Sequence, residues 1–246
     1  MNNKKLNVLI TSGGTDCPID DVRVITNIGT GTFGSQLAEE FLKQECNVIY
    51  LHSKGAEKPI YRHCKINDLN NFYVEVDKIK EIYNEYKELI NNIKFIEVKD
   101  FDDYEEKLLN MNSGDIHIWV MCMAVSDYKP VKVAGKISSN EDYFNLNMER
   151  CPKIIKNLRK KDENAFIVGF KLSSNNTEEQ IADNVLNWME DRKVDMCVAN
   201  DMSRRNHDNR EVYLFKKNSS EYQFYRGSNV SKDLVEQILK EYKTKL

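Results

Sequence analysis

The sequence predicts an α/β fold in which a Rossmann-like parallel sheet carries flanking helices, and two apolar runs support this prediction. Residues 6–11 form a β-branched run that stops at a Ser-Gly-Gly-Thr turn, and a helix and a second apolar run follow it. Such a βαβ opening pairs its two strands in parallel through a right-handed crossover. Residues 116–123 (IHIWVMCM) are almost entirely apolar, which is typical of a central strand because both of its faces are buried.

The remaining elements are predicted in order along the chain. The first helix spans residues 33–43, where Phe33, Leu37 and Phe41 recur at helical spacing, and the second strand spans 47–51. Residues 54–93 interrupt this rhythm and are interpreted as an insertion that carries a charged amphipathic helix at 74–93. Strands are then predicted at 95–98, 116–123, 143–148, 165–170 and 195–198, and helices at 101–111, from 152, and at 177–191. A small C-terminal hairpin at 212–215 and 222–225 and a closing helix at 231–243 complete one predicted domain, residues 1–246.

Composition limits the classes of function. With 41% hydrophobic residues among 246, the chain can bury a sizeable core. Thirty-six Lys and Arg against 39 Asp and Glu leave a net charge of −3, which disfavours nucleic acid as a partner. No apolar run suits a secretory signal or a membrane span, so we expect a soluble cytoplasmic protein. Six cysteines without a C-x-x-C pair and four histidines without a metal-binding pattern favour reduced thiols over disulfides or a zinc site.

Glycines gather near the N-terminus. Five of the ten glycines fall between residues 13 and 34, which indicates backbone that approaches another group closely. Thr30 and Gly31 stand just before a predicted helix, where free amides and the helix dipole favour a phosphate. The first turn lies at the carboxyl end of the first strand and consists of Ser12, Gly13, Gly14 and Thr15.

The segment from Gly29 to Gly34 matches G-x-G-x-x-G, but its context argues against a dinucleotide fingerprint. The glycines do not directly follow the first strand, and the second strand ends in His52 and Ser53 where an acidic ribose-binding residue is required. The sequence also lacks the G-x-x-x-x-G-K-[ST] pattern of P-loop NTPases.

A second candidate site follows the apolar run 116–123. Ala124 is small enough for a ligand to approach its backbone, and Asp127 places a carboxylate at the carboxyl edge of the predicted sheet. Ligands of open α/β sheets bind at this edge. Lys136 lies farther on, in a polar segment, 131–142, that we expect to be flexible.

Seven motifs stand in a fixed order along the chain: ITSGGT, PIDDVRVITNIGTGTFG, MAVSDYKP, KISS, CPKII, GFKL and VAND. Together they resemble the motifs of the phosphopantothenate–cysteine ligase family (phosphopantothenoylcysteine synthetase), which acts in coenzyme A biosynthesis. Because no flavin-dependent decarboxylase half precedes Met1, the resemblance favours the free-standing bacterial form.

The resemblance implies a homodimer and a two-step reaction. The carboxylate of 4′-phosphopantothenate attacks the α-phosphate of a nucleoside triphosphate and pyrophosphate leaves. The amine of L-cysteine then displaces the nucleotide monophosphate from the acyl nucleotidylate. CTP is the expected co-substrate, with ATP left open, and Mg²⁺ is expected to be held mainly by the triphosphate.

The resemblance also implies roles for particular residues. Asn27 would lie beside the acyl group as a catalytic residue, and Arg23 would reach the phosphopantothenate of the neighbouring subunit. Lys136 would be a second catalytic residue that neutralises the triphosphate as its segment closes. The implied substrate contacts are Gly29, Thr30, Gly31, Ala124 and Asp127. The implied nucleotide contacts are Ser12, Gly13, Gly14, Thr15, Asp127, Lys136, Cys151, Pro152, Lys153, Ile154 and Phe170.

Two departures from the family pattern affect the nucleotide side. Many bacterial relatives carry K-I-K-K where this chain has the residues Lys-Ile-Ser-Ser from Lys136 onward. Two lysines expected on the helix after the Gly-Phe motif correspond, on an ungapped count, to Asn187 and Asp191. Arg192 and Lys193 are candidates to replace these lysines.

Two other classes of function stay open at this point. A short-chain-type oxidoreductase would bind NAD(P) and use a Tyr-x-x-x-Lys pair, and Tyr83 with Lys87 has this spacing only on a predicted surface helix. A non-catalytic nucleotide-binding relative would keep the fold, and the replaced helix lysines are the feature that favours it.

Overall fold

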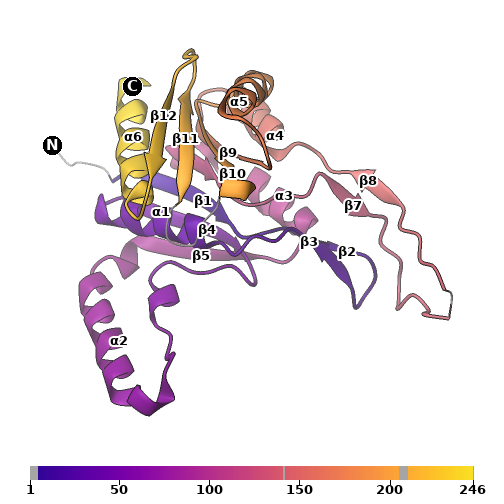
Figure 1. The fold of residues 1–246 in the computed structure, drawn as a ribbon, viewed down its shortest axis with the longest axis horizontal. Coiled ribbons are helices and arrows are strands. Elements are labelled where there is room, and N and C mark those ends of the chain that lie inside the picture. Colours follow the sequence, from indigo (N-terminus) through magenta and orange to yellow (C-terminus); the bar gives the residue numbers. More distant parts are fainter. Residues whose placement is uncertain (1–4, 141, 205–209, 246) are drawn as a thin grey trace.

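The computed structural model describes residues 5–140, 142–204 and 210–245, so His207 lies outside the described part. The main sheet has the strand order β12-β11-β10-β9-β6-β1-β4-β5 (Figure 1). The strands from β10 to β5 in this order are parallel, and β11 and β12 run antiparallel at one end. The bounds are β1 Asn7–Ser12, β4 Asn47–Ser53, β5 Ile93–Val98, β6 Ile118–Met121, β9 Phe166–Ser173, β10 Met196–Asp201, β11 Glu211–Lys216 and β12 Tyr222–Arg226.

The α/β prediction is confirmed, including the parallel βαβ opening. β1 lies in the middle of the parallel strands, with β4 on one side and β6 on the other. The chain therefore leaves the centre in one direction with β4 and β5 and returns to build β6, β9 and β10 in the other. This reversal of strand order falls between β1 and β6, and the carboxyl ends of strands at such a point are the usual place for a ligand.

Helices cover both faces of the sheet (Figure 1). Apolar side chains of α1 and α6 join one core with Val8, Ile10 and Val120 of the sheet. α3, α4 and α5 pack on the other face around Trp119 and Ile167. The helix bounds are α1 Thr32–Lys43, α2 Phe72–Tyr86, α3 Phe101–Asn110, α4 Ile154–Lys161, α5 Glu178–Arg192 and α6 Val230–Lys245.

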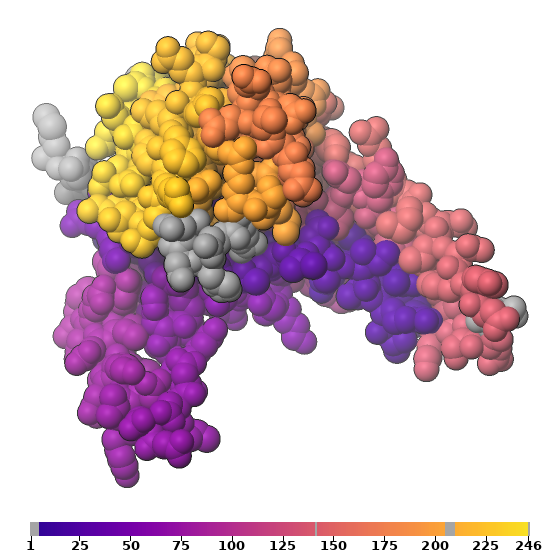
Figure 2. Space-filling model, viewed as in Figure 1, coloured from indigo at the N-terminus to yellow at the C-terminus, as the bar shows by residue number. Residues whose placement is uncertain are grey.

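The inserted helix α2 is shorter than the 74–93 predicted. It ends at Tyr86, and a 3-10 turn at Ile90–Asn92 leads into β5. The expected end was wrong because Ile93 pairs with Val48 of the neighbouring strand, so sheet pairing overrides the helical pattern there. α2 projects from the body of the molecule (Figures 1 and 2), and Tyr83 on the expected apolar stripe is 62% exposed.

Two short hairpin-like pairs form a projecting arm beside the sheet (Figures 1 and 2). β2 (Asp16–Pro18) pairs with β3 (Val24–Thr26), and β7 (Tyr128–Pro130) pairs with β8 (Met148–Arg150). The strand predicted at 143–148 was therefore wrong. Only Met148 of that range is in a strand, and it pairs with Pro130 in the arm because the chain folds back on β7 there.

The C-terminal hairpin is not a separate unit. β11 pairs with β10 and carries the hairpin into the main sheet.

Four of the six cysteines are buried, whereas Cys64 is exposed and Cys122 is half-buried. Among the residues that the structure describes, no helix combines the length and the apolar character needed to cross a membrane.

Candidate functional site

The predicted glycine-rich turns pack against one another at the carboxyl end of β1. A Cβ atom on Gly14 would lie 2.3 Å from the carbonyl oxygen of Asn27, and one on Gly29 would lie 2.7 Å from the carbonyl oxygen of Gly13. Gly13 also has φ +94°, a backbone conformation that other residues rarely adopt. These glycines are therefore required by the close approach of the two turns, 12–15 and 27–31.

Hydrogen bonds join the first turn to the end of β6. The Ala124 amide donates to the Gly13 carbonyl over 2.8 Å, and the Thr15 amide donates to the Ala124 carbonyl over 3.1 Å. The Thr15 hydroxyl accepts from the amide of Ser126, and it donates to the hydroxyl of that residue. Hydrogen bonds thus join the two predicted motifs into one unit at the carboxyl ends of β1 and β6, and we call this unit, residues 12–15, 27 and 124–127, the ridge.

Asn27 belongs to this ridge. Its side-chain Nδ2 donates to the Ala124 carbonyl oxygen over 3.1 Å, and the residue is half-buried. The structure therefore brings the predicted catalytic Asn27 directly beside the predicted substrate contact Ala124, although 97 residues separate them in the sequence.

The N-terminus of α1 opens beside the ridge. Its N-cap, Gly31, has φ +75° and offers no side-chain cap, and the first turn of the helix contains no acidic residue. The hydroxyl of Ser12 donates to the Gly31 carbonyl over 3.1 Å, and the amide of Glu57 donates to the Thr30 carbonyl over 2.9 Å. Thr30 and Gly31 are therefore held in place while the dipole of α1 favours an anion.

Phe170, within β9, faces this helix. Its ring meets the ring of Phe33 edge-on, with 5.8 Å between the centroids. The guanidinium of Arg210 lies 3.9 Å from the centroid of the Phe33 ring. Neither the sequence motifs nor the periodicity singled out Arg210, which reaches this position from the chain just before β11.

Asp127 lies at the end of the ridge and is exposed. It forms an ion pair with Lys153, and its backbone carbonyl accepts a hydrogen bond of 2.9 Å from the amide of Cys151. The structure thus gathers Asp127 with the predicted nucleotide contacts Cys151, Pro152, Lys153 and Ile154, which lead into α4. The hydrogen bond from Lys153 lowers the pKa of the Asp127 carboxyl, and the positive charges of Lys171 and Arg192 act in the same direction.

Lys171 and Arg192 line a shallow cavity of about 410 Å³ beside this group. The Arg192 guanidinium lies 4.8 Å over the ring of Trp188 and 2.8 Å from a carboxylate oxygen of Asp191. The replaced positions Asn187 and Asp191 line the same cavity. The cavity therefore keeps cations even though the helix lacks the two lysines. Sequence reasoning missed Lys171, although it directly follows Phe170 in the GFKL motif.

Arg23 and Lys136 lie together on the projecting arm. Arg23 pairs with Asp20 and donates to the Ile137 carbonyl oxygen over 2.9 Å. The segment predicted to be flexible is bound to the β2–β3 turn on both sides of the exposed Lys136. Lys136 and Arg23 therefore stand on the arm, and Asn27 and Ala124 stand on the ridge.

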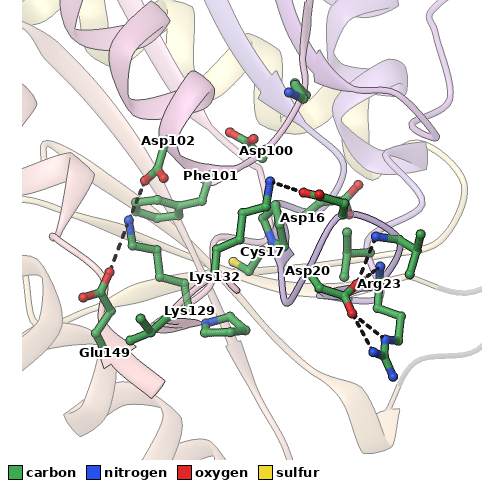
Figure 3. A pocket seen from close by; sticks show the side chains of 17 residues that line it. Asp16, Cys17, Asp20, Arg23, Asp100, Phe101, Asp102, Lys129, Lys132 and Glu149 are labelled. Carbon is green, nitrogen blue, oxygen red and sulfur yellow. Dashed lines mark hydrogen bonds and ion pairs between the residues drawn. The ribbon is translucent and has the colours of Figure 1, made fainter. Parts of the chain in front are cut away.

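A cavity of about 620 Å³ lies between this arm and the start of α3 (Figure 3). Two of its cations have acidic partners, since Lys129 lies 2.7 Å from Asp102 and 3.5 Å from Glu149, and Lys132 lies 2.9 Å from Asp21. Six acidic and four basic side chains line the cavity, so its net negative charge disfavours phosphates, and we place the candidate site at the carboxyl edge of the sheet instead.

Comparison with known proteins identifies the family. The model of the DNA/pantothenate metabolism flavoprotein C-terminal domain matches residues 3–89 and 83–242. The chain belongs to this family. The matched residues cover nearly the whole chain, including the ridge, the N-terminus of α1 and the arm.

Two curated relatives illustrate the range of the family. The coenzyme A biosynthesis bifunctional protein CoaBC of Methanocaldococcus jannaschii is 30% identical over 96% of this chain and 50% of its own length. The phosphopantothenate–cysteine ligase CAB2 of Saccharomyces cerevisiae is 29% identical over 68% of this chain and 57% of its own length. The chain spans about half the length of the curated relatives it matches.

Solved structures share the fold. The DNA/pantothenate metabolism flavoprotein from Streptococcus pneumoniae has a TM-score of 0.76 at 24% identity, and the match covers 97% of this chain and 99% of that chain. A Cab2 mutant in complex with phosphopantothenate-cysteine has a TM-score of 0.79 at 22% identity, with 98% of this chain and 87% of that chain covered.

Proposed function

We propose that the protein is a phosphopantothenate–cysteine ligase. The observation that carries the proposal is the convergence of five motif segments, distant in the sequence, on the carboxyl edge of β1, β6 and β9. They bring together a helix N-terminus for a phosphate, an amide at Asn27, and cations beside Asp127. Two relatives named for coenzyme A biosynthesis or for this ligase activity support the same assignment.

The chemistry requires two bond exchanges. An oxygen of the 4′-phosphopantothenate carboxylate attacks the α-phosphorus of the nucleotide, and the bond from this phosphorus to the bridging oxygen of pyrophosphate breaks. The cysteine amine then attacks the acyl carbon, loses a proton, and displaces the nucleotide monophosphate. The first step is needed because a carboxylate is a poor electrophile. The site must therefore stabilise the negative charge of the phosphates during this step and protect the resulting mixed anhydride from water.

The residues divide this work. The amides at the start of α1 would hold the substrate phosphate, and Asn27 would orient the reacting carboxylate. Lys136, Lys171 and Arg192 would offset the charge of the triphosphate. Among the described residues no cluster of three His, Cys, Asp or Glu side chains is placed to hold a metal ion. Since a triphosphate carries several negative charges, we assign Mg²⁺ mainly to the phosphate oxygens of the nucleotide, with CTP as the expected co-substrate and ATP as the alternative.

The alternatives have less support. Tyr83 of the Tyr-x-x-x-Lys pair lies on α2, which projects away from the carboxyl edge of β1 and β6 (Figure 1). A non-catalytic role was favoured only by the missing helix lysines, and the cavity beside Asp127 contains Lys171 and Arg192.

A direct assay tests the proposed function. The protein is incubated with 4′-phosphopantothenate, cysteine, Mg²⁺ and either CTP or ATP, and pyrophosphate and the nucleotide monophosphate are measured. We expect one nucleotide to be cleaved only when phosphopantothenate is present. If both nucleotides stay intact with all substrates in excess, the ligase assignment is wrong.

Neutralising the two cations of the cavity beside Asp127 should weaken nucleotide binding. We expect Lys171→Gln and Arg192→Gln each to raise the KM for the nucleotide about 10-fold, since a hydrogen bond to a charged group contributes about 1.5–3 kcal/mol. The KM for phosphopantothenate should change little. Lys156→Gln is the matched control, because Lys156 also pairs with Asp191 but does not line the cavity. Equal nucleotide KM values in all three variants would remove Lys171 and Arg192 from the site.

We further propose that the protein is a homodimer that associates through the arm. The arm exposes a set of large apolar side chains to solvent, which a two-stranded element rarely tolerates without a partner. These side chains are Val22, Val24, Val131, Val133, Tyr143, Phe144 and Met148.

Charges on the arm should dissociate this dimer. We expect Val24→Asp combined with Val131→Asp to weaken self-association at least 100-fold in sedimentation equilibrium, because two carboxylates would be buried in an apolar interface. Val74→Asp is the control, since Val74 is as exposed as Val24 but lies on α2. A dimer that survives this double substitution would contradict the proposed interface.

A second experiment tests whether the site is shared between subunits. If Arg23 serves the neighbouring subunit, mixing Arg23→Ala with Asn27→Ala protein should restore activity.

A further inference from the structure

Asp20 is a buried carboxylate at the centre of the arm, and no sequence motif assigned it a role. The residue is 2% exposed. Its Oδ1 accepts hydrogen bonds from the backbone amides of Val22 and Arg23 over 2.9 and 2.8 Å. Its Oδ2 accepts from the Arg23 side chain through Nε at 3.0 Å and Nη2 at 2.5 Å. These bonds lower the pKa of Asp20, so the carboxylate is ionised at neutral pH.

The same oxygen also binds the segment that carries Lys136. The Ile137 amide donates to Oδ2 of Asp20 over 3.1 Å, and the Ile137 carbonyl accepts from Nη2 of Arg23 over 2.9 Å. Both polar groups of the Ile137 backbone are thus engaged by the Asp20–Arg23 pair. A displacement of Arg23 must therefore disturb the residue directly after Lys136.

A second, separate anchor holds the segment on its other side. The Asp21 amide donates to the Gly135 carbonyl over 3.0 Å, and the Gly135 amide donates to Oδ2 of Asp21 over 2.9 Å. Lys132 pairs with the other oxygen of Asp21. Asp21 therefore binds the segment without touching Arg23 or Ile137 through any hydrogen bond among the described residues.

We propose that Asp20 is a positioning residue that joins Arg23 to the Lys136 segment, so that binding of phosphopantothenate and binding of the nucleotide triphosphate are coupled. This inference rests on the proposed function, in which Lys136 meets the triphosphate, and on the role that the family resemblance implies for Arg23, which would reach the phosphopantothenate of the neighbouring subunit. Because coupling between two binding sites is reciprocal, each substrate raises the affinity for the other by the same factor.

The coupling is measured as the change in Kd of a non-hydrolysable CTP or ATP analogue when saturating phosphopantothenate is added. In the unaltered protein we expect the Kd to fall at least fivefold, which lies at the lower end of typical coupling between sites. In Asp20→Asn the factor should fall to about 1, because the neutral side chain no longer holds the Arg23 guanidinium. Asp21→Asn, the matched control, should keep the factor of the unaltered protein.

A proteolysis measurement and a second variant add tests that do not depend on activity. Cleavage by trypsin after Lys136 should be at least fivefold faster in Asp20→Asn than in the unaltered protein, and added phosphopantothenate should slow it only in the unaltered protein. Ile137→Pro, which removes the amide donor but leaves the carboxylate and Arg23 intact, is the second variant if Asp20→Asn does not fold. It should also abolish the coupling.

The outcomes separate the two proposals. If the unaltered protein releases pyrophosphate but Asp20→Asn and Ile137→Pro keep its coupling factor, Asp20 is only structural and the inference is wrong. If the unaltered protein is active without any coupling, the inference is also wrong while the ligase function stands. If the unaltered protein neither binds phosphopantothenate nor releases pyrophosphate, the proposed function itself fails.

Discussion

Lys136→Gln is expected to lower the rate of nucleotidyl transfer by about 10² or more, because removing one charge-stabilising group from a reacting phosphate site costs on this order. Lys136 is exposed on the arm, and its neighbours Gly135 and Ile137 are bound by Asp21 and Asp20. The ammonium group thus stands on a backbone that is held on both sides, and we expect it to act when the segment closes over the triphosphate. The thermal stability should change by no more than about 0.5 kcal/mol, as is typical of exposed positions.

Single-turnover release of pyrophosphate measures this rate, and a thermal melt measures the stability. Lys132→Gln is the control, because Lys132 lies in the same segment but pairs with Asp21. Its rate should stay within threefold of the unaltered protein. A near-normal rate for Lys136→Gln would show that Lys136 is simply a solvated lysine.

Asn27→Ala is expected to reduce formation of the acyl nucleotidylate by about 10² to 10³, the usual cost of losing one preorganised donor at a reacting group. Its amide lies 3.1 Å from the Ala124 carbonyl oxygen on the ridge between β1 and β6. The substitution removes the group that we place beside the reacting carboxylate, and it also leaves the Ala124 carbonyl with one hydrogen bond fewer. The loss of activity should therefore far exceed the loss of stability.

Rapid quenching followed by separation of the intermediate measures this step. Asn47→Ala is the matched control, because Asn47 makes a comparable side-chain hydrogen bond of 2.9 Å to Asn7 at the opposite edge of the sheet. It should lose a similar amount of stability, about 1 kcal/mol, and keep its activity. A folded Asn27→Ala protein with unchanged turnover would exclude Asn27 from the site.

Local sequence signals predicted most of the fold. The alternation of apolar runs and helical stripes placed β1, α1, β4 and β6 within a few residues of their observed positions. Thr177, the expected first residue of a helix, is the N-cap of α5 and forms a capping box with Gln180. Such features are local, because a strand or a helix cap depends on neighbouring residues in the chain.

The crowding of glycines in the sequence predicted backbone that approaches another group closely, but the structure was needed to show that Gly14 meets the Asn27 carbonyl and Gly29 meets the Gly13 carbonyl. Tertiary structure alone decided the rest. β8 pairs with β7 in the arm, and α2 stops where Ile93 joins the sheet. The cations that gather near Asp127, and the contact of Asp20 with both Arg23 and Ile137, depend on chain segments far apart in the sequence. Periodicity and motif spacing report only local geometry, so they contain no information on which distant charges will meet.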